Sequence, residues 1–70
     1  MSVTYNRLWK LLIDKHMKRT DLIEACSLSS NVIARLGKNQ YVSLETIDKL
    51  CQYFKCEIQD IIKVELERDE

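Results

Sequence analysis

The chain has 70 residues, which is enough for one small domain but too few for a large ligand cavity beside its core. Its single glycine and absence of proline argue against a loop-rich or all-β fold. The 11 basic and 11 acidic residues give a net charge of zero, which argues against a nucleic-acid binder held by bulk charge alone.

The charges are unevenly distributed along the chain. Residues 1–50 carry eight basic and five acidic side chains, a net charge of +3, whereas residues 51–70 carry a net charge of −3. The basic part therefore permits contact with phosphate groups. We expect residues 1–66 to form one domain and the acidic residues 67–70 to be a disordered tail.

The first predicted element is an amphipathic helix from Ser2 to His16. Ser2 or Thr4 is a suitable cap for its start. We expect His16 to cap the carbonyl groups at its end rather than to act in catalysis. Apolar side chains at helical spacing predict one buried face. This face comprises Tyr5, Leu8, Trp9, Leu12 and Ile13.

Two shorter helices follow, joined by a tight polar turn. The second helix is predicted from about Arg19 to Cys26, and residues 27–29 form the turn. Ser29 is predicted to cap a third helix over residues 30–36, because its hydroxyl can accept a hydrogen bond from a backbone N–H in the first turn. Gly37 is typical of a helix end.

A polar loop over residues 38–42 leads to a fourth helix, which Ser43 is predicted to cap. A fifth, short helix is predicted from about Ile58 to Ile62, and residues 63–66 fit either a short strand or a frayed helix. Together these elements predict an all-α, compact five-helix bundle. The apolar stripe of the fourth helix comprises Leu44, Ile47, Leu50, Cys51 and Phe54.

The order and spacing of these segments resemble the Cro/CI-type helix-turn-helix family of transcriptional regulators, also called the phage-repressor-like or xenobiotic-response-element family. The resemblance covers roughly residues 5–62. It implies the lambda-repressor-like DNA-binding fold, with the third helix in the major groove of DNA. The residues that carry it are Leu22, Ser27, Leu28-Ser29, Asn31-Val32-Ile33 and Ser43-Leu44-Glu45-Thr46-Ile47.

The chain departs from the family pattern at several positions. Ile23 replaces a small residue. Ser27 replaces the usual turn glycine, so a left-handed backbone conformation at this turn would cost more free energy. Arg19 replaces a glutamine but still suits a phosphate contact. Lys18 cannot serve as the usual serine or threonine cap.

The resemblance implies two sets of DNA-contacting residues, because phosphate contacts fix the position of a protein and base contacts supply its sequence preference. Residues that face outward from the third helix are expected to contact bases: Ser30, Asn31, Ala34 and Arg35. Residues around the second helix start and the loop after the third helix are expected to contact phosphates: Lys18, Arg19, Thr20, Ser29, Lys38, Asn39, Gln40, Tyr41 and Ser43.

Each assignment has a simpler alternative. Asn31 suits an adenine edge, Arg35 a guanine and Ala34 a thymine methyl group. Asn31 and Ala34 also suit a solvated helix surface, and Arg35 suits a phosphate or an acidic partner. Ser29 fits a cap better than a base contact, and the ring of Tyr41 can pack on the core while its hydroxyl stays accessible.

The expected partner is double-stranded DNA, bound by a homodimer whose recognition helices lie about 34 Å apart. The candidate dimer surfaces are the fourth helix, the fifth helix and the tail from Lys63, where Val64 and Leu66 are the most plausible added apolar contacts. We expect no membrane span, no small-molecule ligand and a cytoplasmic protein of bacterial or phage origin. The alternative is a protein-interaction module, such as an antitoxin or anti-repressor-like partner, that uses this fold without binding DNA.

Neither an enzyme nor a cofactor or metal site is expected. No nucleophile and base stand at a suggestive spacing, and no glycine-rich phosphate loop is present. Cys26, Cys51 and Cys56 fall at or near apolar positions, where a free thiol behaves as a small hydrophobic group. Because no C-x-x-C pair occurs, a zinc site that includes His16 has little support.

Overall fold

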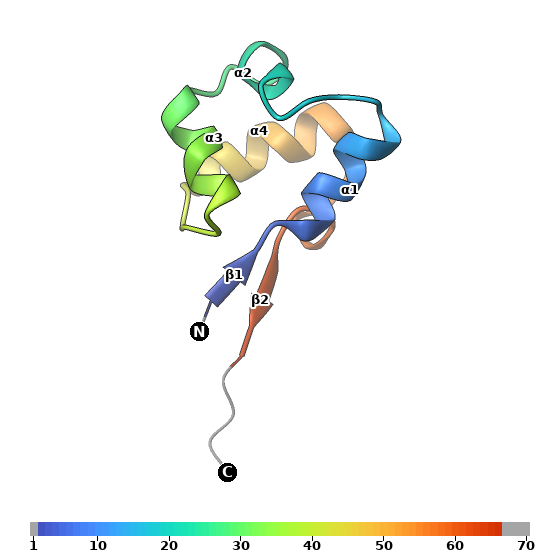
Figure 1. Cartoon of the computed structure of the whole chain (residues 1–70). Helices are drawn as coiled ribbons and strands as arrows, with labels where there is room; N and C mark the ends of the chain where they lie inside the picture. Colours follow the sequence, from blue (N-terminus) through green and yellow to red (C-terminus); the bar gives the residue numbers. More distant parts are fainter. Residues whose placement is uncertain (1, 67–70) are drawn as a thin grey trace.

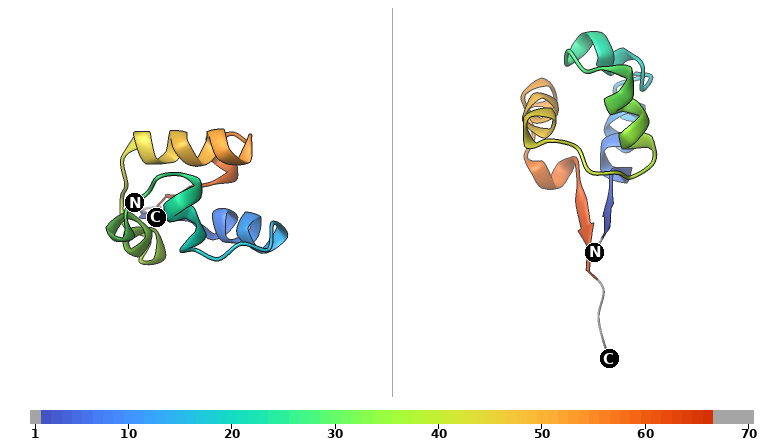
Figure 2. Two further views of the ribbon diagram at one scale, coloured as in Figure 1. Left: turned by 90° about the horizontal axis from the view of Figure 1, so that it is seen from above. Right: turned by 90° about the vertical axis from the view of Figure 1, so that its left-hand side faces the viewer.

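The structure is a computed structural model that describes residues 2–66. Four α-helices form the body, and two short strands lie side by side at the end opposite α2 (Figures 1 and 2). The predicted tail, residues 67–70, lies outside the described residues. In chain order the elements are β1 (Ser2–Thr4), α1 (Asn6–Asp14), α2 (Asp21–Ala25), α3 (Ser30–Gly37), α4 (Leu44–Phe54), the 3-10 turn η1 (Ile58–Asp60) and β2 (Lys63–Glu65).

The two strands correct the prediction of an all-α bundle. The segment expected to begin the first helix is instead β1, which pairs antiparallel with β2 so that Val3 lies opposite Val64. Neither Ser2 nor Thr4 caps α1; the cap position is Tyr5, which makes no side-chain capping bond. The β-branched residues of β1 favour a strand once a partner is available. Of the two alternatives for residues 63–66, the strand is the one observed.

The fifth helix is also shorter than predicted. Residues 58–62 form only one 3-10 turn, η1, rather than an α-helix. The Asp60 carboxylate accepts a hydrogen bond from the Glu57 backbone N–H at 3.1 Å, which holds the start of this turn. Arg7 on α1 donates from Nη1 to the Gln59 carbonyl oxygen at 2.7 Å and so joins η1 to the first helix. The observed fold is thus four α-helices with a small two-stranded sheet.

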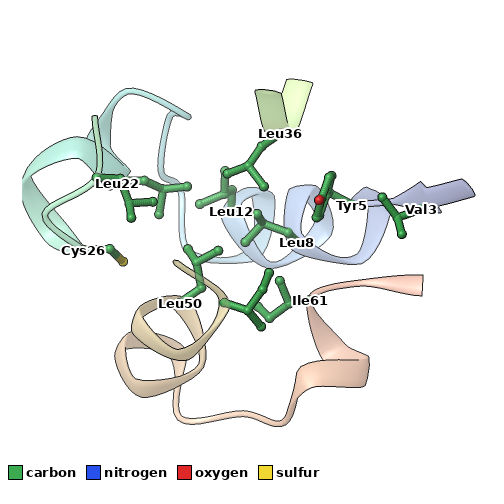
Figure 3. Packing of buried hydrophobic residues seen from close by; sticks show 11 residues of the cluster. Val3, Tyr5, Leu8, Leu12, Leu22, Cys26, Leu36, Leu50 and Ile61 are labelled. Carbon is green, nitrogen blue, oxygen red and sulfur yellow. The ribbon is translucent and has the colours of Figure 1, made fainter. Parts of the chain in front are cut away.

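One core joins β1 and the four α-helices, and Ile61 and Ile62, between η1 and β2, also pack in it (Figure 3). Ile13 and Leu44, both predicted to be buried, are instead 71% and 75% exposed. Ile13 lies in the last turn of α1 and Leu44 in the first turn of α4. The fully buried side chains are Tyr5, Leu8, Leu22, Leu36, Leu50 and Ile61.

A non-glycine residue in the left-handed conformation follows each α-helix within two residues of its end. After α1, for example, the Met17 N–H donates to the Leu12 carbonyl oxygen at 2.9 Å, which closes a Schellman motif. Gly37 was predicted to stop the third helix but lies inside α3, and the left-handed position falls at Asn39. The four left-handed residues, with φ between 54° and 56°, are His16, Ser27, Asn39 and Lys55.

Candidate nucleic-acid interface

The helix pair α2 and α3 is joined by the predicted turn, residues 27–29. Ser27 has a φ of 55°, so the residue that replaces the usual glycine does adopt the left-handed conformation. The following residue, Leu28, donates its N–H to the Ile23 carbonyl oxygen at 3.2 Å and is buried in the core. The turn is therefore anchored by one apolar side chain, which fixes the direction in which α3 leaves α2.

The helix α3 begins where it was predicted to begin. The Ser29 hydroxyl accepts a hydrogen bond from the Val32 N–H at 3.2 Å, which confirms the serine cap. Val32 and Ile33 are half-buried against the core, so the opposite side of the helix faces solvent. That exposed side carries all four residues predicted to contact bases, Ser30, Asn31, Ala34 and Arg35.

The start of α2 is held by its own acidic residue. The Asp21 carboxylate accepts a hydrogen bond from the Lys18 N–H at 2.8 Å, which compensates for the missing serine or threonine cap. Backbone bonds from Asp21 to Lys18 and from Leu22 to Arg19 add a tight turn before α2. This turn leaves the predicted phosphate contacts Lys18, Arg19 and Thr20 exposed.

Arg19 lies against two residues whose role the sequence did not indicate. Its guanidinium carbon is 4.0 Å from the centre of the Trp9 ring, a cation–π geometry. A Cβ atom on Gly37 would lie 3.1 Å from Arg19 Nη1. Trp9 is half-buried, so the predicted core residue also supplies a platform for a basic side chain.

The loop after α3 is tied to the start of α1. The Tyr5 hydroxyl donates to the Gln40 carbonyl oxygen at 2.6 Å, and the Asn39 Oδ1 atom accepts from the Tyr5 N–H at 3.3 Å. The alternative in which the Tyr41 ring packs on the core is not observed, since Tyr41 is 67% exposed. The loop is thus fixed at its backbone while the Tyr41 ring faces solvent.

The loop ends at the predicted cap of α4. The Ser43 hydroxyl accepts from the Thr46 N–H at 3.2 Å, and it also lies 3.2 Å from the Thr46 hydroxyl. Of the nine residues predicted to contact phosphates, every one is exposed. Two of them, Asn39 and Ser43, already make bonds that hold the fold.

The charged side chains in and around α3 are all basic over a long stretch of the chain. No acidic residue occurs between Glu24 and Glu45, and the only charged residues in that stretch are Arg35 and Lys38. The stretch includes all of α3, the turn before it and the loop after it. A phosphate backbone can therefore approach α3 without meeting a carboxylate on that helix.

Three further findings on the described chain concern metal ions, membranes and thiols. Residues 2–66 contain no group of three or more His, Cys, Asp and Glu side chains placed to hold a metal ion. No helix in this part of the chain is long and apolar enough to cross a membrane. The three cysteines are free thiols, with Cys26 buried and the other two half-buried.

Comparison with known proteins agrees with this geometry. A protein-family model described as the Cro/C1-type HTH DNA-binding domain matches residues 7–67. Among solved structures, the crystal structure of the transcriptional regulator VanUg (form II) is similar, with a TM-score of 0.84 and 48% sequence identity. The match covers 89% of this chain and 83% of the VanUg chain. No match is found among curated proteins.

Proposed function

We propose that this chain, which belongs to the family of Cro/C1-type HTH DNA-binding domains, regulates transcription by binding a specific sequence of double-stranded DNA. The observation that carries the proposal is the exposed side of α3, which presents one basic and two polar side chains and no acidic group. A helix with this surface suits the major groove. The similarity to a solved transcriptional regulator supports the regulatory role.

In this proposal sequence preference comes from α3. Asn31 and Arg35 are four residues apart and both exposed, so they can reach neighbouring base pairs from one face of the helix. Asn31 would bind an adenine and Arg35 a guanine, each through two hydrogen bonds, while Ala34 and Ser30 contact the adjacent bases. Each bidentate pair would contribute about 1–3 kcal/mol of discrimination against a wrong base.

Two segments on either side of α3 would hold the DNA backbone. The turns before α2 and α3 supply Lys18, Arg19, Thr20 and Ser29, and the loop after α3 supplies Lys38, Asn39, Gln40, Tyr41 and Ser43. Arg19 is already oriented by Trp9, which lowers the conformational entropy lost when it binds a phosphate. The loop is oriented by Tyr5 in the same way.

Binding to fluorescently labelled duplexes, measured by anisotropy at several salt concentrations, tests the proposal. We expect affinity to fall steeply as salt rises, because neutralised phosphates release counterions. Lys38→Ala should reduce the slope of log affinity against log salt by about one, whereas the control Lys10→Ala, on α1 and outside the proposed contacts, should leave it unchanged. No affinity even at low salt would contradict the proposal and favour a protein-interaction module.

A further inference from the structure

Two of the three cysteines meet at the end of α4. The Cys56 N–H donates to the Cys51 carbonyl oxygen at 3.1 Å, and Lys55 between them is left-handed, with φ 54° and ψ 52°. This is the Schellman geometry, in which the side chains of the two bonded residues frequently make contact. The backbone of one short segment therefore brings the two thiols together.

The same backbone bond follows α1 and α2. After α1 it joins Leu12 and Met17, and after α2 it joins Ile23 and Leu28. Both of these pairs are apolar, which is the usual choice at this position. After α4 both residues are cysteine, so a contact that is elsewhere apolar becomes a pair of thiols.

The pair is a neutral dithiol at neutral pH. Cys51 and Cys56 are free, half-buried and packed against the core. Burial raises the pKa of both thiols, and the carboxylate of Asp60 on η1 adds to the rise. Each thiol also affects the pKa of the other, so the two are neighbours. Asp48, three residues before Cys51 on α4, raises the pKa of Cys51 further.

The number of ligands and the charge of the site restrict what this dithiol can bind. A structural zinc ion takes four ligands, whereas residues 2–66 hold no group of three or more metal-binding side chains. Oxidation to a disulfide begins with a thiolate, which burial and the nearby carboxylates disfavour. A ligand that binds two thiols and leaves the site uncharged fits these surroundings best.

We infer that Cys51 and Cys56 form a binding site for trivalent arsenic, as arsenous acid or a monosubstituted arsenical. Arsenous acid is uncharged at neutral pH, and each thiol replaces one of its hydroxyl groups. Two As–O bonds break and two As–S bonds form, while the thiol protons leave with the hydroxyl groups as two molecules of water. No electron is transferred, and the site is neutral before and after binding.

The fold makes this pair a chelate. Because the Schellman backbone already holds Cys51 beside Cys56, the second As–S bond closes at a high effective concentration of thiol. The site lies at the end of α4 that is farther from α3 (Figure 1). Arsenic binding is therefore independent of the proposed DNA contacts.

Mass spectrometry of the reduced full chain with one equivalent of phenylarsine oxide tests the inference, in the presence of excess 2-mercaptoethanol. We expect one adduct per chain, with the added mass of phenylarsine oxide less one water. Cys51→Ser and Cys56→Ser should each lose this adduct, because the monothiol displaces an arsenical held by a single As–S bond. Cys26→Ser is the matched control, and it should keep the adduct.

Competition against a small dithiol measures what the fold contributes. We expect the affinity of the native chain for phenylarsine oxide to be about tenfold higher in buffer than in 8 M urea, where the two thiols are no longer held together. The arsenical should also raise the melting temperature of the native chain, but not that of Cys51→Ser/Cys56→Ser. Circular dichroism confirms that each variant is folded.

An adduct that survives Cys51→Ser or Cys56→Ser, or that is lost in folded Cys26→Ser, would overturn the inference. Equal affinity in buffer and in urea would also overturn it, as would an arsenical that joins two chains. All of these measurements are made without DNA, so their failure leaves the proposed function standing. Conversely, a chain without DNA affinity that still forms the adduct would contradict the proposed function alone.

Discussion

The guanidinium of Arg19 lies over the ring of Trp9, with the guanidinium carbon 4.0 Å from the ring centre. Arg19 stands before α2 and Trp9 on α1, so the contact joins the start of the helix-turn-helix unit to the first helix. At a partly exposed site such a contact contributes about 0.5–1 kcal/mol. Its larger effect is to limit the positions that the arginine can adopt before a phosphate arrives.

Gly37→Ala tests this arrangement from the α3 side. The added Cβ would lie 3.1 Å from Arg19 Nη1, so the guanidinium must move by a few tenths of an ångström. Alanine improves helix propensity by up to about 1 kcal/mol, so the free energy of unfolding should stay unchanged or rise. DNA affinity, measured by anisotropy, should fall.

The control for this prediction is the same substitution in an Arg19→Ala background. There the added methyl group meets no guanidinium, so Gly37→Ala should cause no further loss of DNA affinity. An equal loss in both backgrounds would show that Gly37 acts through something other than Arg19.

Tyr5→Phe tests the attachment of the loop after α3. The substitution removes the 2.6 Å hydrogen bond to the Gln40 carbonyl oxygen while it keeps the buried ring. We expect the free energy of unfolding to fall by about 1 kcal/mol in urea denaturation, the net value of one hydrogen bond. Tyr41→Phe is the matched control, because that ring is exposed, and it should leave stability unchanged. Equal effects of the two variants would argue against the loop anchor.

Ser27→Gly should stabilise the protein. Ser27 has a φ of 55°, a conformation that costs a residue with a side chain roughly 1–2 kcal/mol. Glycine avoids this cost but loses more backbone entropy on folding, so the net gain should be about 0.5–1 kcal/mol in urea denaturation. Asn39→Gly, at the equivalent position after α3, should instead destabilise, because Asn39 Oδ1 accepts from the Tyr5 N–H. A loss of stability for Ser27→Gly would contradict this account of the turn.

The thiols of Cys51 and Cys56 should react slowly at neutral pH. Burial raises the pKa of both thiols, so the reactive thiolate forms only above the ordinary thiol pKa of about 8.5. Iodoacetamide labelling against pH should therefore give a higher midpoint in the folded chain than in 8 M urea. The neutral thiols stabilise the fold fully below the ordinary pKa, and this contribution is lost as pH rises through the raised values. Identical midpoints in the folded and unfolded chain would contradict the burial.

Local signals allowed the sequence to predict α3 and α4. Ser29 and Ser43 each cap a helix through the N–H three residues later, a contact that lies within one short segment. The exposed side of α3 also followed from helical spacing alone. That local pattern therefore suggested which residues of α3 can meet DNA.

Contacts distant in sequence explain what the prediction missed. β1 becomes a strand because β2, about sixty residues later, supplies its partner, and no pattern in residues 2–4 indicates this. The attachment of Asn39 to Tyr5 likewise spans 34 residues. The end of α3 was misplaced for a different reason. Asn39, rather than the nearby Gly37, adopts the left-handed conformation after this helix.

The central claim, that α3 reads the sequence of DNA, is tested most directly by selection from a random duplex pool. The native chain and Arg35→Ala would each select bound duplexes, which are then sequenced. We predict that the native chain enriches a defined site and that Arg35→Ala still binds duplex DNA but loses preference at one guanine, a discrimination of about 1–3 kcal/mol. Identical enriched sites for the two proteins, or no enrichment by the native chain, would contradict the claim.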